Sequence, residues 1–529
     1  MTAATLLPWP LACLAGLVAG RWAGLGWLAA GGFSLACSTA AWLLGGPRPS
    51  FRRGAGSARP SRLRESALER WVRRHPDAVL LGYGAPWQVR EARRFFAAAA
   101  GPRAEAGLSP FAHAGRTRAL TLDAEGGGHT LAVGAPGTGK TQLFALLALQ
   151  AVARGEAVVL LDPKGGRGLR ERLAGAAQRA RRPYFQLLAA EPEASDAFDL
   201  LANGRAAGEL ASRIARLVPA GEQDNAFGQF AWMTLHRLIA AQQVAGEPVT
   251  LGRLQAHVAD QGQALWRRLQ ACAQAPASVQ AGLAALVAHE PAHYRKMILA
   301  LAPVLETLCA GPLGALLSDE ARPRLTLGQI VRQGGVLYAG LGALSDDVAA
   351  RALGALLLAD LAALAGDRYR GGGDARPIRL FVDEAAEVTN PAFIQLLNKG
   401  RECGVQVTFA VQTLADLEVA MGGEGPARMM VGNAANLVAF RTLDAASREA
   451  WSARAGQVWV RSRHSSQAAQ QGGGTAAVRR SRSAGRSDSL QEAPLLPEAL
   501  LAQLPDLAFA GLVRGRQAVV GRLPLLAPG

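Results

Sequence analysis

Hydrophobic and polar residues follow one another along most of the chain in a pattern that predicts strands and helices in turn. Short apolar runs bounded by glycine, proline or charged residues predict buried strands, and longer segments with apolar residues three or four positions apart predict helices. The predicted core strands cover residues 79–84, 131–133, 157–161, 183–188, 335–339, 378–382, 405–411 and 437–440. Strands that alternate with helices are typical of an α/β fold with a parallel sheet.

The stretch from residue 205 to residue 320 has a different, purely helical pattern. Helices are predicted at residues 206–217, 230–243, 262–274, 280–287 and 294–309, and no strand pattern interrupts them. We therefore expect an all-α domain inserted into the α/β core.

The first 46 residues are apolar and carry a single charged side chain, Arg21. Residues 2–20 and 22–44 are each long enough to cross a hydrocarbon core of ~30 Å. Tryptophans stand near the expected interfaces and arginines follow the second span: Trp9, Trp22, Trp27, Trp42, Arg48, Arg52, Arg53, Arg59, Arg62 and Arg64. This pattern predicts a transmembrane helical hairpin with the rest of the chain in the cytoplasm.

Two other interpretations of this segment stay open. A cleaved signal peptide fits less well, because no basic region precedes the apolar stretch and the stretch is doubled. A single crossing would result if Pro8 and Pro10 disrupt the first span.

The charge balance indicates a polyanionic partner. Lysine and arginine number 57 against 41 aspartates and glutamates, which gives a formal charge of +16. Nucleic acid and an anionic membrane surface both fit this excess, and codon bias alone also explains a preference for arginine. The five cysteines form no CxxC pair, so they predict free thiols and no metal site other than one for Mg²⁺.

A glycine-rich loop lies between a predicted strand and a predicted helix. It consists of Gly134, Ala135, Pro136, Gly137, Thr138, Gly139, Lys140 and Thr141. This is the P-loop spacing, in which backbone N–H groups surround phosphate oxygens at the positive end of a helix. Lys140 is then expected to reach the β- and γ-phosphates of ATP, and the hydroxyl of Thr141 to hold Mg²⁺. A chance match is the alternative, but lysine is too scarce here for one to be expected.

An acidic pair ends a later predicted strand and fits the second half of a nucleotide site. A P-loop NTPase needs an acidic residue beside the P-loop strand to order Mg²⁺ and a second carboxylate to orient water. Asp383 fits the first role and Glu384 the second.

Four further residues are weaker candidates from pattern alone. Lys164 lies in an Asp-Pro-Lys-Gly turn after a strand, which is either an ordinary turn or part of the ligand edge. Gln412 ends the next strand and can sense the γ-phosphate or be a plain turn residue. Arg401 and Arg441 can each reach the γ-phosphate of a neighbouring subunit, although most arginines are solvated surface charges.

Residues 461–489 are rich in serine, glutamine, glycine and arginine without apolar periodicity, which predicts a mobile spacer rather than a nucleic-acid contact. The expected organisation is a transmembrane hairpin (1–46), a basic linker (47–77), the first part of an NTPase core (78–204), the all-α domain (205–320), the second part of the core (321–458), a flexible segment (459–492) and a C-terminal return to the core (493–529).

These motifs together resemble the coupling proteins of conjugative transfer and type IV secretion, the TraD/TraG group. The resemblance is strongest to the TraD branch of integrative conjugative elements and TOL-type plasmids. It is carried by residues 128–141, 161–165, 224–227, 334–341, 381–390, 393–401 and 410–413. Two features depart from the group: Gly165-Gly166 replaces the acidic residue common after Asp-Pro-Lys-Gly, and residues 461–489 match no motif of the group.

The resemblance implies a RecA-like P-loop NTPase, anchored in the bacterial inner membrane as a homo-hexamer. Such a motor hydrolyses ATP with Mg²⁺, threads DNA through a central channel, and links a relaxase–DNA complex to the type IV secretion channel. The resemblance also implies that Arg401 is the arginine that acts in trans and that Gln412 couples hydrolysis to movement.

Two alternative functions stay open. A membrane adaptor could bind nucleotide only to assemble and recruit cargo without translocating it. An FtsK-like DNA pump is the other, although a longer membrane region and a C-terminal winged helix, both usual in such pumps, are not evident.

Overall fold

The computed structural model describes residues 60–99, 110–204, 206–218, 225–272, 274–318, 321–371, 376–471 and 480–528. The predicted transmembrane hairpin at residues 1–46 lies outside the described residues.

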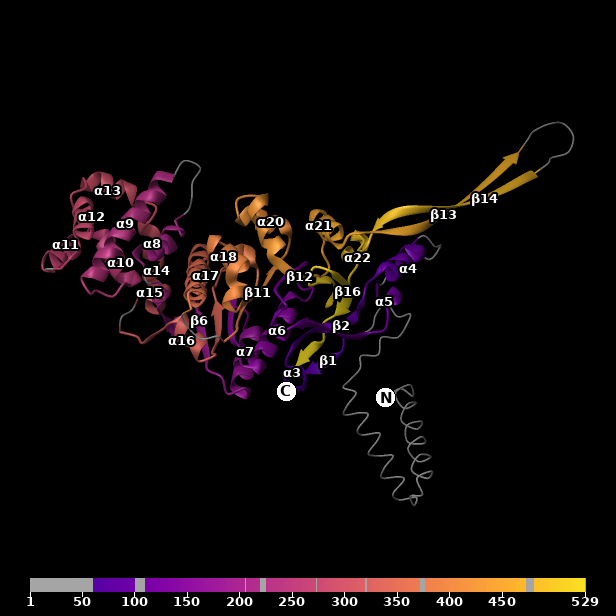
Figure 1. The fold of residues 1–529 in the computed structure, drawn as a ribbon, viewed down its shortest axis with the longest axis horizontal. Coiled ribbons are helices and arrows are strands. Elements are labelled where there is room, and N and C mark those ends of the chain that lie inside the picture. The colour runs from indigo at the N-terminus through magenta and orange to yellow at the C-terminus, as the bar shows by residue number, and fades with distance from the viewer. Residues whose placement is uncertain are drawn as a thin grey trace, which may run out of the picture. The chain divides into compact units, whose positions relative to one another are not determined.

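A mixed sheet of eleven strands, in the order β3-β2-β16-β15-β12-β4-β11-β10-β5-β9-β6, forms the centre of the described chain (Figure 1). Seven neighbouring strands are parallel: β12 (Ala434–Ala439), β4 (His129–Val133), β11 (Val405–Val411), β10 (Ile378–Val382), β5 (Ala157–Asp162), β9 (Val336–Gly340) and β6 (Tyr184–Leu188). Their carboxyl ends share one edge, which is where open α/β sheets bind ligands.

Four antiparallel strands extend the sheet beyond β12: β15 (Ala508–Val513), β16 (Gln517–Arg522), β2 (Ala78–Pro86) and β3 (Arg118–Asp123). A short parallel pair joins β1 (Arg62–Arg64) to β17 (Leu525–Ala527). The C-terminal segment therefore adds two strands to the sheet and meets the start of the described chain.

The strand that ends in Asp383 does not lie beside the P-loop strand, contrary to our expectation. β4 pairs with β11, and β11 pairs with β10. Hydrophobic patterning marks strands but not their neighbours, so the sequence could not reveal that β11 separates the two.

Alternate residues of the central strands enter two hydrophobic cores. Ala132 of β4 belongs to the core that contains α3 (Glu65–Arg74), α6 (Lys140–Arg154) and α7 (Arg167–Arg179), whereas Leu131 and Val133 belong to the core on the other face. That second core includes α17 (Asp347–Tyr369) and α18 (Pro391–Lys399). Because helices cover both faces, the central strands are mostly apolar, with a few polar residues such as Arg379 of β10 and Gln406 of β11.

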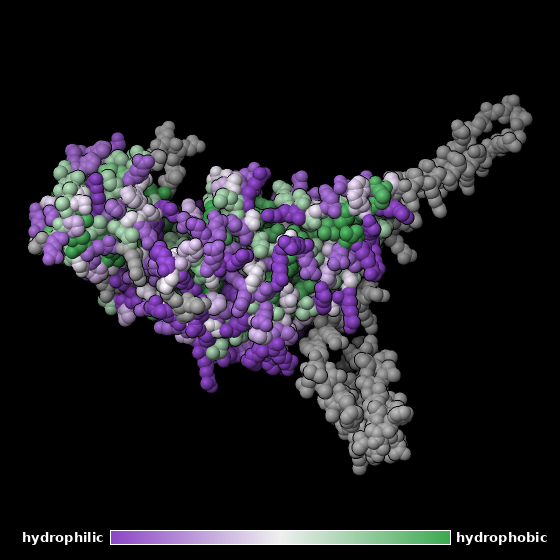
Figure 2. Space-filling model, viewed as in Figure 1, coloured by the Kyte–Doolittle hydropathy of each residue, from purple (hydrophilic) through white to green (hydrophobic). Residues whose placement is uncertain are grey.

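Among the described residues, α17 alone is long and apolar enough to cross a membrane, and 56% of its most apolar window is buried inside the protein. Hydrophilic residues dominate the face of the molecule shown in Figure 2, with hydrophobic residues in scattered patches.

Among the described residues, eight helices lie between β7 (Ala197–Phe198) and β8 (Arg324–Leu325), which pair in parallel at the base of this segment. They are α8 (Ala207–Ala215), α9 (Asn225–Val244), α10 (Leu251–Ala259), α11 (Gln263–Gln270), α12 (Ala277–Val287), α13 (Pro291–Met297), α14 (Ala302–Cys309) and α15 (Gly311–Leu317). The single helix predicted at 294–309 is two helices, because Pro303 fits only the first turn of a helix and α14 begins there.

Two strands form a long ribbon within the segment that was predicted to be flexible. β13 (Gln457–Gln471) and β14 (Arg480–Pro494) pair along fifteen residues each. Ladder hydrogen bonds involve only the backbone, so a sequence without apolar periodicity can still form such a hairpin.

The remaining helices connect or cover these elements. They are α4 (Val89–Ala99), α5 (Pro110–His113), α16 (Leu327–Arg332), α19 (Leu414–Ala420), α20 (Glu424–Asn433), α21 (Ala445–Ala455) and α22 (Glu498–Ala502).

Candidate functional site

The glycine-rich loop connects the carboxyl end of β4 to the first turn of α6. Gly137 and Gly139 have φ angles of 75° and 130°, which side chains of L-residues rarely permit. A Cβ atom on Gly134 would lie 2.7 Å from the Cβ of Phe440. Glycine is therefore required at these points for the loop to turn and for β12 to approach it.

Two neighbouring segments hold the loop in place. The N–H of Ala135 donates to the carbonyl of Arg441 at 2.9 Å, just beyond β12. The N–H of Leu507 donates to the carbonyl of Thr138 at 2.8 Å, just before β15. The C-terminal part of the chain thus contributes directly to the shape of the loop.

Lys140 is buried at the start of α6 and folds back over the loop. Its Nζ donates to the carbonyl of Gly134 at 2.5 Å and lies 3.8 Å from Oε1 of Glu384. Burial lowers the pKa of Lys140, and the carboxylates of Glu384 and Asp383 oppose that change. A cation held here can meet phosphate oxygens that occupy the loop.

Thr141 and Asp383 bring two oxygen atoms together from different elements. Oγ1 of Thr141 donates to Oδ2 of Asp383 at 3.5 Å. Burial raises the pKa of Asp383 to about 6, and the negative charges of Asp162 and Glu384 contribute further. Mg²⁺ prefers oxygen ligands. The hydroxyl of Thr141 and the buried carboxylate of Asp383, whose negative charge needs a compensating positive charge, are therefore a donor set suited to Mg²⁺.

Glu384 directly follows Asp383 and has a left-handed backbone, with φ of 45°. Its N–H donates to Oδ1 of Asp383 at 3.1 Å, and Nζ of Lys164 donates to its Oε1 at 3.1 Å. A non-glycine residue in this conformation costs of order 1–3 kcal/mol and persists only where its surroundings hold it. The carboxylate is thereby held between Lys140 and Lys164.

The turn after β5 explains how Lys164 reaches this position. Oδ1 of Asp162 accepts the N–H groups of Lys164 and Gly165 at 3.0 and 3.1 Å. Its Oδ2 accepts the N–H of Gly166 at 2.8 Å and the hydroxyl of Tyr338 at 2.7 Å. Sequence reasoning left Lys164 undecided and missed Tyr338; the scarcity of lysine was the one useful signal.

Gln412 and Arg441 both lie at this edge of the sheet. The N–H of Gly134 donates to the carbonyl of Val411 at 3.4 Å. Gln412 directly follows Val411 at the end of β11, so it lies next to the loop and between the ends of β4 and β10. The guanidinium of Arg441 pairs with Asp506 of the same chain at 2.9 Å.

Arg401 is not brought to the site of its own chain. It is exposed in the short 3₁₀ turn Gly400–Cys403, just before β11 begins, and so lies at the amino ends of the parallel strands. The nucleotide loop and the acidic pair lie at the carboxyl ends.

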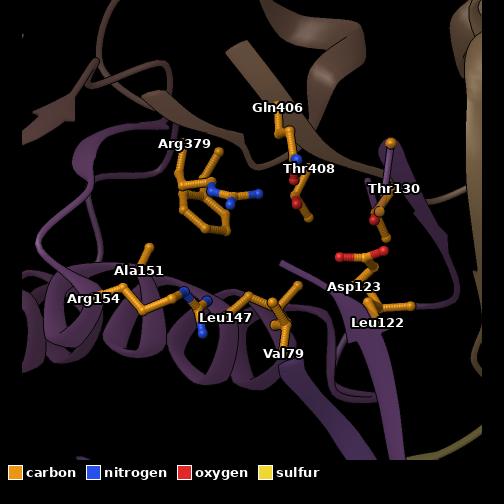
Figure 3. Close-up of a pocket in the computed structure, with 13 residues that line it drawn as sticks. Val79, Leu122, Asp123, Thr130, Leu147, Ala151, Arg154, Arg379, Gln406 and Thr408 are labelled. Carbon is orange, nitrogen blue, oxygen red and sulfur yellow. The ribbon is translucent and has the colours of Figure 1, made fainter. Parts of the chain in front are cut away.

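A small cavity at the amino ends of the strands is not the nucleotide site. Arg154 from α6 and Arg379 from β10 line it together with Gln406 and Thr408 of β11 (Figure 3). Its volume of about 30 Å³ has room for a water molecule rather than a nucleotide.

Comparisons with known proteins agree with this arrangement. Residues 377–506 match the family model described as the TraM recognition site of TraD and TraG. No curated protein matches the sequence.

Solved structures of coupling proteins share the fold. The unbound monoclinic form of the bacterial conjugative coupling protein TrwB, lacking its first 70 residues, is 18% identical with a TM-score of 0.51, and the match covers 75% of this chain and 84% of that one. TrwB with the non-hydrolysable ATP analogue ADPNP is 19% identical with a TM-score of 0.50, and the match covers 75% of this chain and 85% of that one. At this identity the likeness establishes the fold alone.

Proposed function

We propose, from the confirmed resemblance to the TraD/TraG group of conjugative coupling proteins, that this chain is an ATP-driven DNA translocase. In this role it links a relaxase–DNA complex to a type IV secretion or conjugation channel. The observation that carries the proposal is the convergence of Lys140, Thr141, Asp383 and Glu384 at one edge of the sheet. The match of residues 377–506 and the fold shared with TrwB support a conjugative coupling role.

ATP with Mg²⁺ is the cofactor that this site fits. The glycine-rich loop of residues 134–141 and Nζ of Lys140 would hold the phosphates, and Thr141 and Asp383 would be the Mg²⁺ ligands. When bound there, Mg²⁺ would supply positive charge that offsets the negative charge of the phosphates. Glu384 orients the attacking water, and Gln412, between the loop and the acidic pair, senses loss of the γ-phosphate.

The remaining assignments follow the resemblance. Residues 1–46 anchor the chain in the bacterial inner membrane, and the motor lies in the cytoplasm. The chain assembles as a homo-hexamer in which Arg401 of one subunit completes the site of the next. DNA, single-stranded and without sequence preference, passes through the channel, and the relaxase and the secretion channel are partners.

Phosphate release by the purified full-length protein, with Mg-ATP and single-stranded DNA, tests the assignment. We expect Lys140→Ala and Glu384→Gln to abolish release, because one loses the phosphate cation and the other the group that orients water. Glu387→Gln is the matched control, since Glu387 is exposed three residues further on, and should retain wild-type turnover. Wild-type turnover in either site variant would refute the site, and no release by the wild type would favour the adaptor role.

A further inference from the structure

A second cavity, of about 410 Å³, lies at the opposite end of α6 from the glycine-rich loop. Residues of α3, α6 and α7, which pack together on one face of the sheet, line it near the carboxyl ends of these helices (Figure 1). Small-molecule sites have volumes of ~300–1,000 Å³, so this cavity has room for a ligand. Because α6 has fifteen residues and is ~22 Å long, the cavity is separate from the nucleotide site.

Arginine dominates the polar lining of this cavity. Four arginines and one acid line it: Arg73, Arg154, Arg179, Arg182 and Glu69. The other lining residues are glycine, alanine, valine and leucine. Apart from Glu69, the charged side chains of the lining are therefore hydrogen-bond donors, as in a site for an anion.

Two of these arginines are held in place by neighbours that use only part of each guanidinium. Nε and Nη2 of Arg179 donate to Glu69 and Glu65, both at 2.7 Å. Nε of Arg182 donates to the carbonyl of Gly334 at 2.8 Å, and its Nη2 donates to the same oxygen. Within the described part of the chain, Nη1 of neither arginine has a hydrogen-bond partner. Both guanidinium groups are thus oriented and keep donors for a ligand.

Positive charge exceeds negative charge around the cavity. Three carboxylates pair with the arginines that line it, and the same carboxylates also pair with two arginines behind them. Six arginines (Arg73, Arg154, Arg172, Arg179, Arg182 and Arg379) therefore stand against Glu65, Glu69 and Glu156. Among the described residues, Arg73 and Arg182 have no carboxylate partner. Burial lowers the pKa of Arg182, and the positive charge of Arg376 lowers it further.

The helix ends account for only part of this excess. α3, α6 and α7 each have an arginine in the last turn, where a cation offsets the helix dipole. The carboxyl end of a helix carries roughly half a negative charge, so three ends supply roughly 1.5. Since six arginines stand against three carboxylates, positive charge is left over, and a bound anion would compensate it.

We propose that this cavity binds a phosphate-bearing anion with at least two negative charges. Guanidinium groups match phosphate oxygens with paired hydrogen bonds, and a phosphate accepts from several directions at once. Arg73 of α3, Arg179 of α7 and Arg182 just after α7 can therefore share one ligand. Its source is a free polyphosphate or a phospholipid headgroup, since α3 begins at residue 65 and the predicted transmembrane hairpin ends at residue 46.

Thermal unfolding of the full-length protein with increasing sodium pyrophosphate tests the proposal. Every sample carries Lys140→Ala, so that the glycine-rich loop lacks its phosphate cation. Pyrophosphate should raise the melting temperature, because a ligand that binds only the folded state stabilises it. Arg73→Gln combined with Arg182→Gln should raise the Kd of pyrophosphate roughly 100-fold, since each lost charge-assisted hydrogen bond weakens binding about tenfold.

Arg74→Gln combined with Arg181→Gln is the matched control. Both are exposed neighbours of the substituted arginines, and neither lines the cavity. This variant has the same net charge as the cavity variant and should keep the parental Kd. An equal loss of affinity in the two variants would show that only net charge matters, and would overturn the proposal.

A single substitution separates a lost ligand from a lost fold. Arg73 is exposed and has no hydrogen-bond partner within the described residues. Without pyrophosphate, Arg73→Gln should therefore melt at the same temperature as Arg74→Gln. With pyrophosphate, only Arg73→Gln should show a Kd raised about tenfold.

Nanodiscs distinguish the two sources of phosphate. The protein is compared in phosphatidylcholine nanodiscs with and without phosphatidic acid. Stabilisation by phosphatidic acid that requires Arg73, with none from pyrophosphate, would identify a headgroup, whereas stabilisation by pyrophosphate would identify a free ligand. The absence of Arg73-dependent stabilisation by either would overturn the proposal, and so would equal stabilisation by citrate, which contains no phosphate. Because no ATP is present, failure here is distinct from failure of ATP hydrolysis, which refutes the motor instead.

Discussion

Individual side chains at the carboxyl edge of the sheet determine what the site can do, and Glu384 is the most constrained of them. Lys140 and Lys164 approach its carboxylate from two sides, at 3.8 and 3.1 Å, and its backbone is left-handed. Although partial burial acts in the opposite direction, the hydrogen bond and charge of Glu384 raise the pKa of Lys164. Lys164 is therefore a cation held against the carboxylate of Glu384.

Replacing Lys164 by methionine should slow catalysis more than it weakens binding. Loss of one charge-assisted hydrogen bond to Glu384 is worth about 1.5–3 kcal/mol, so we expect kcat to fall about tenfold or more while nucleotide affinity changes little. Steady-state ATP hydrolysis and equilibrium binding of an ATP analogue measure the two effects. Lys296→Met, an exposed lysine on α13, is the control. An equal loss of affinity would instead make Lys164 a phosphate ligand.

Some of these residues could be predicted from the sequence and others could not, depending on whether their contacts are local in the sequence or depend on strand pairing. Lys140 and Thr141 follow from local spacing, because a P-loop is built from consecutive residues. Lys164 meets Glu384 only because β5 pairs with β10, with Leu161 opposite Val382. A contact set by strand pairing leaves no mark in the residues around either partner.

Whole elements depend on side chains that complete their backbone hydrogen bonds, and α6 provides the clearest case. β2 bulges between Leu80 and Gly82 in its pairing with β3. Gln150 of α6 accepts the N–H of Leu80 at 2.7 Å and donates to its carbonyl at 2.9 Å. One buried amide thus binds β2 to the helix that follows the nucleotide loop.

Gln150→Leu should destabilise the protein by about 2–4 kcal/mol, because the N–H and carbonyl of Leu80 then stay buried without partners. Thermal and urea unfolding curves measure the loss, and Gln178→Leu, at an exposed position on α7, should leave the midpoint unchanged. Wild-type stability in Gln150→Leu would mean that water reaches the bulge.

A buried ion pair joins α17 of the core to the helical segment. Arg213 of α8 donates to Oδ1 of Asp360 at 2.8 Å, and Asn203 donates to Oδ2 at 2.8 Å. Burial raises the pKa of Asp360 to about 7, with Asp199 acting in the same direction and Arg213 and Asn203 opposing it. The carboxyl therefore holds a proton in the folded protein at pH values where the unfolded chain has lost it.

The raised pKa of Asp360 determines the direction in which pH changes the unfolding free energy. Between about pH 4 and pH 7 the folded state binds more protons at Asp360 than the unfolded state does, so this group lowers the unfolding free energy as pH rises. Asp360→Asn removes this pH-dependent contribution to the unfolding free energy. The melting temperature of the variant minus that of the wild type should therefore increase as pH rises from about 4 to 7, and stay constant above pH 7. A relative loss with rising pH would show that Arg213 keeps the carboxylate ionised.

Secondary-structure elements were predicted correctly where the hydrophobic periodicity is strong. They were predicted wrongly where strand pairing or a single residue determines the structure. The core strands were predicted because two buried faces make them mostly apolar. Pro303 divides one predicted helix into two. The strands of the β13–β14 ribbon have no apolar repeat from which they could be predicted. The position of β11 between β4 and β10 depends on chain topology, which composition does not encode.

Arg401 acquires its proposed role only in the proposed hexamer. In its own subunit it lies at the amino ends of the strands, away from the carboxyl edge that holds Lys140 and Glu384, whereas Arg441 pairs with Asp506 beside its own loop. A site that needs an arginine at the γ-phosphate must then receive it from a neighbour, and a closed ring supplies one to every interface.

Mixing two inactive variants tests this arrangement. Arg401→Ala and Glu384→Gln should each lose hydrolysis alone, the former by a factor of 10³ or more. Assembled together, they should recover activity, because about a quarter of the interfaces in a randomly mixed ring pair an intact Glu384 with an intact Arg401. Phosphate release by proteins mixed before assembly measures the recovery, and Arg441→Ala mixed with Glu384→Gln tests the competing arginine. If the Arg401 mixture stays inactive while the Arg441 mixture recovers, Arg441 is the residue that crosses the interface, and its contact with Asp506 must break when the ring closes.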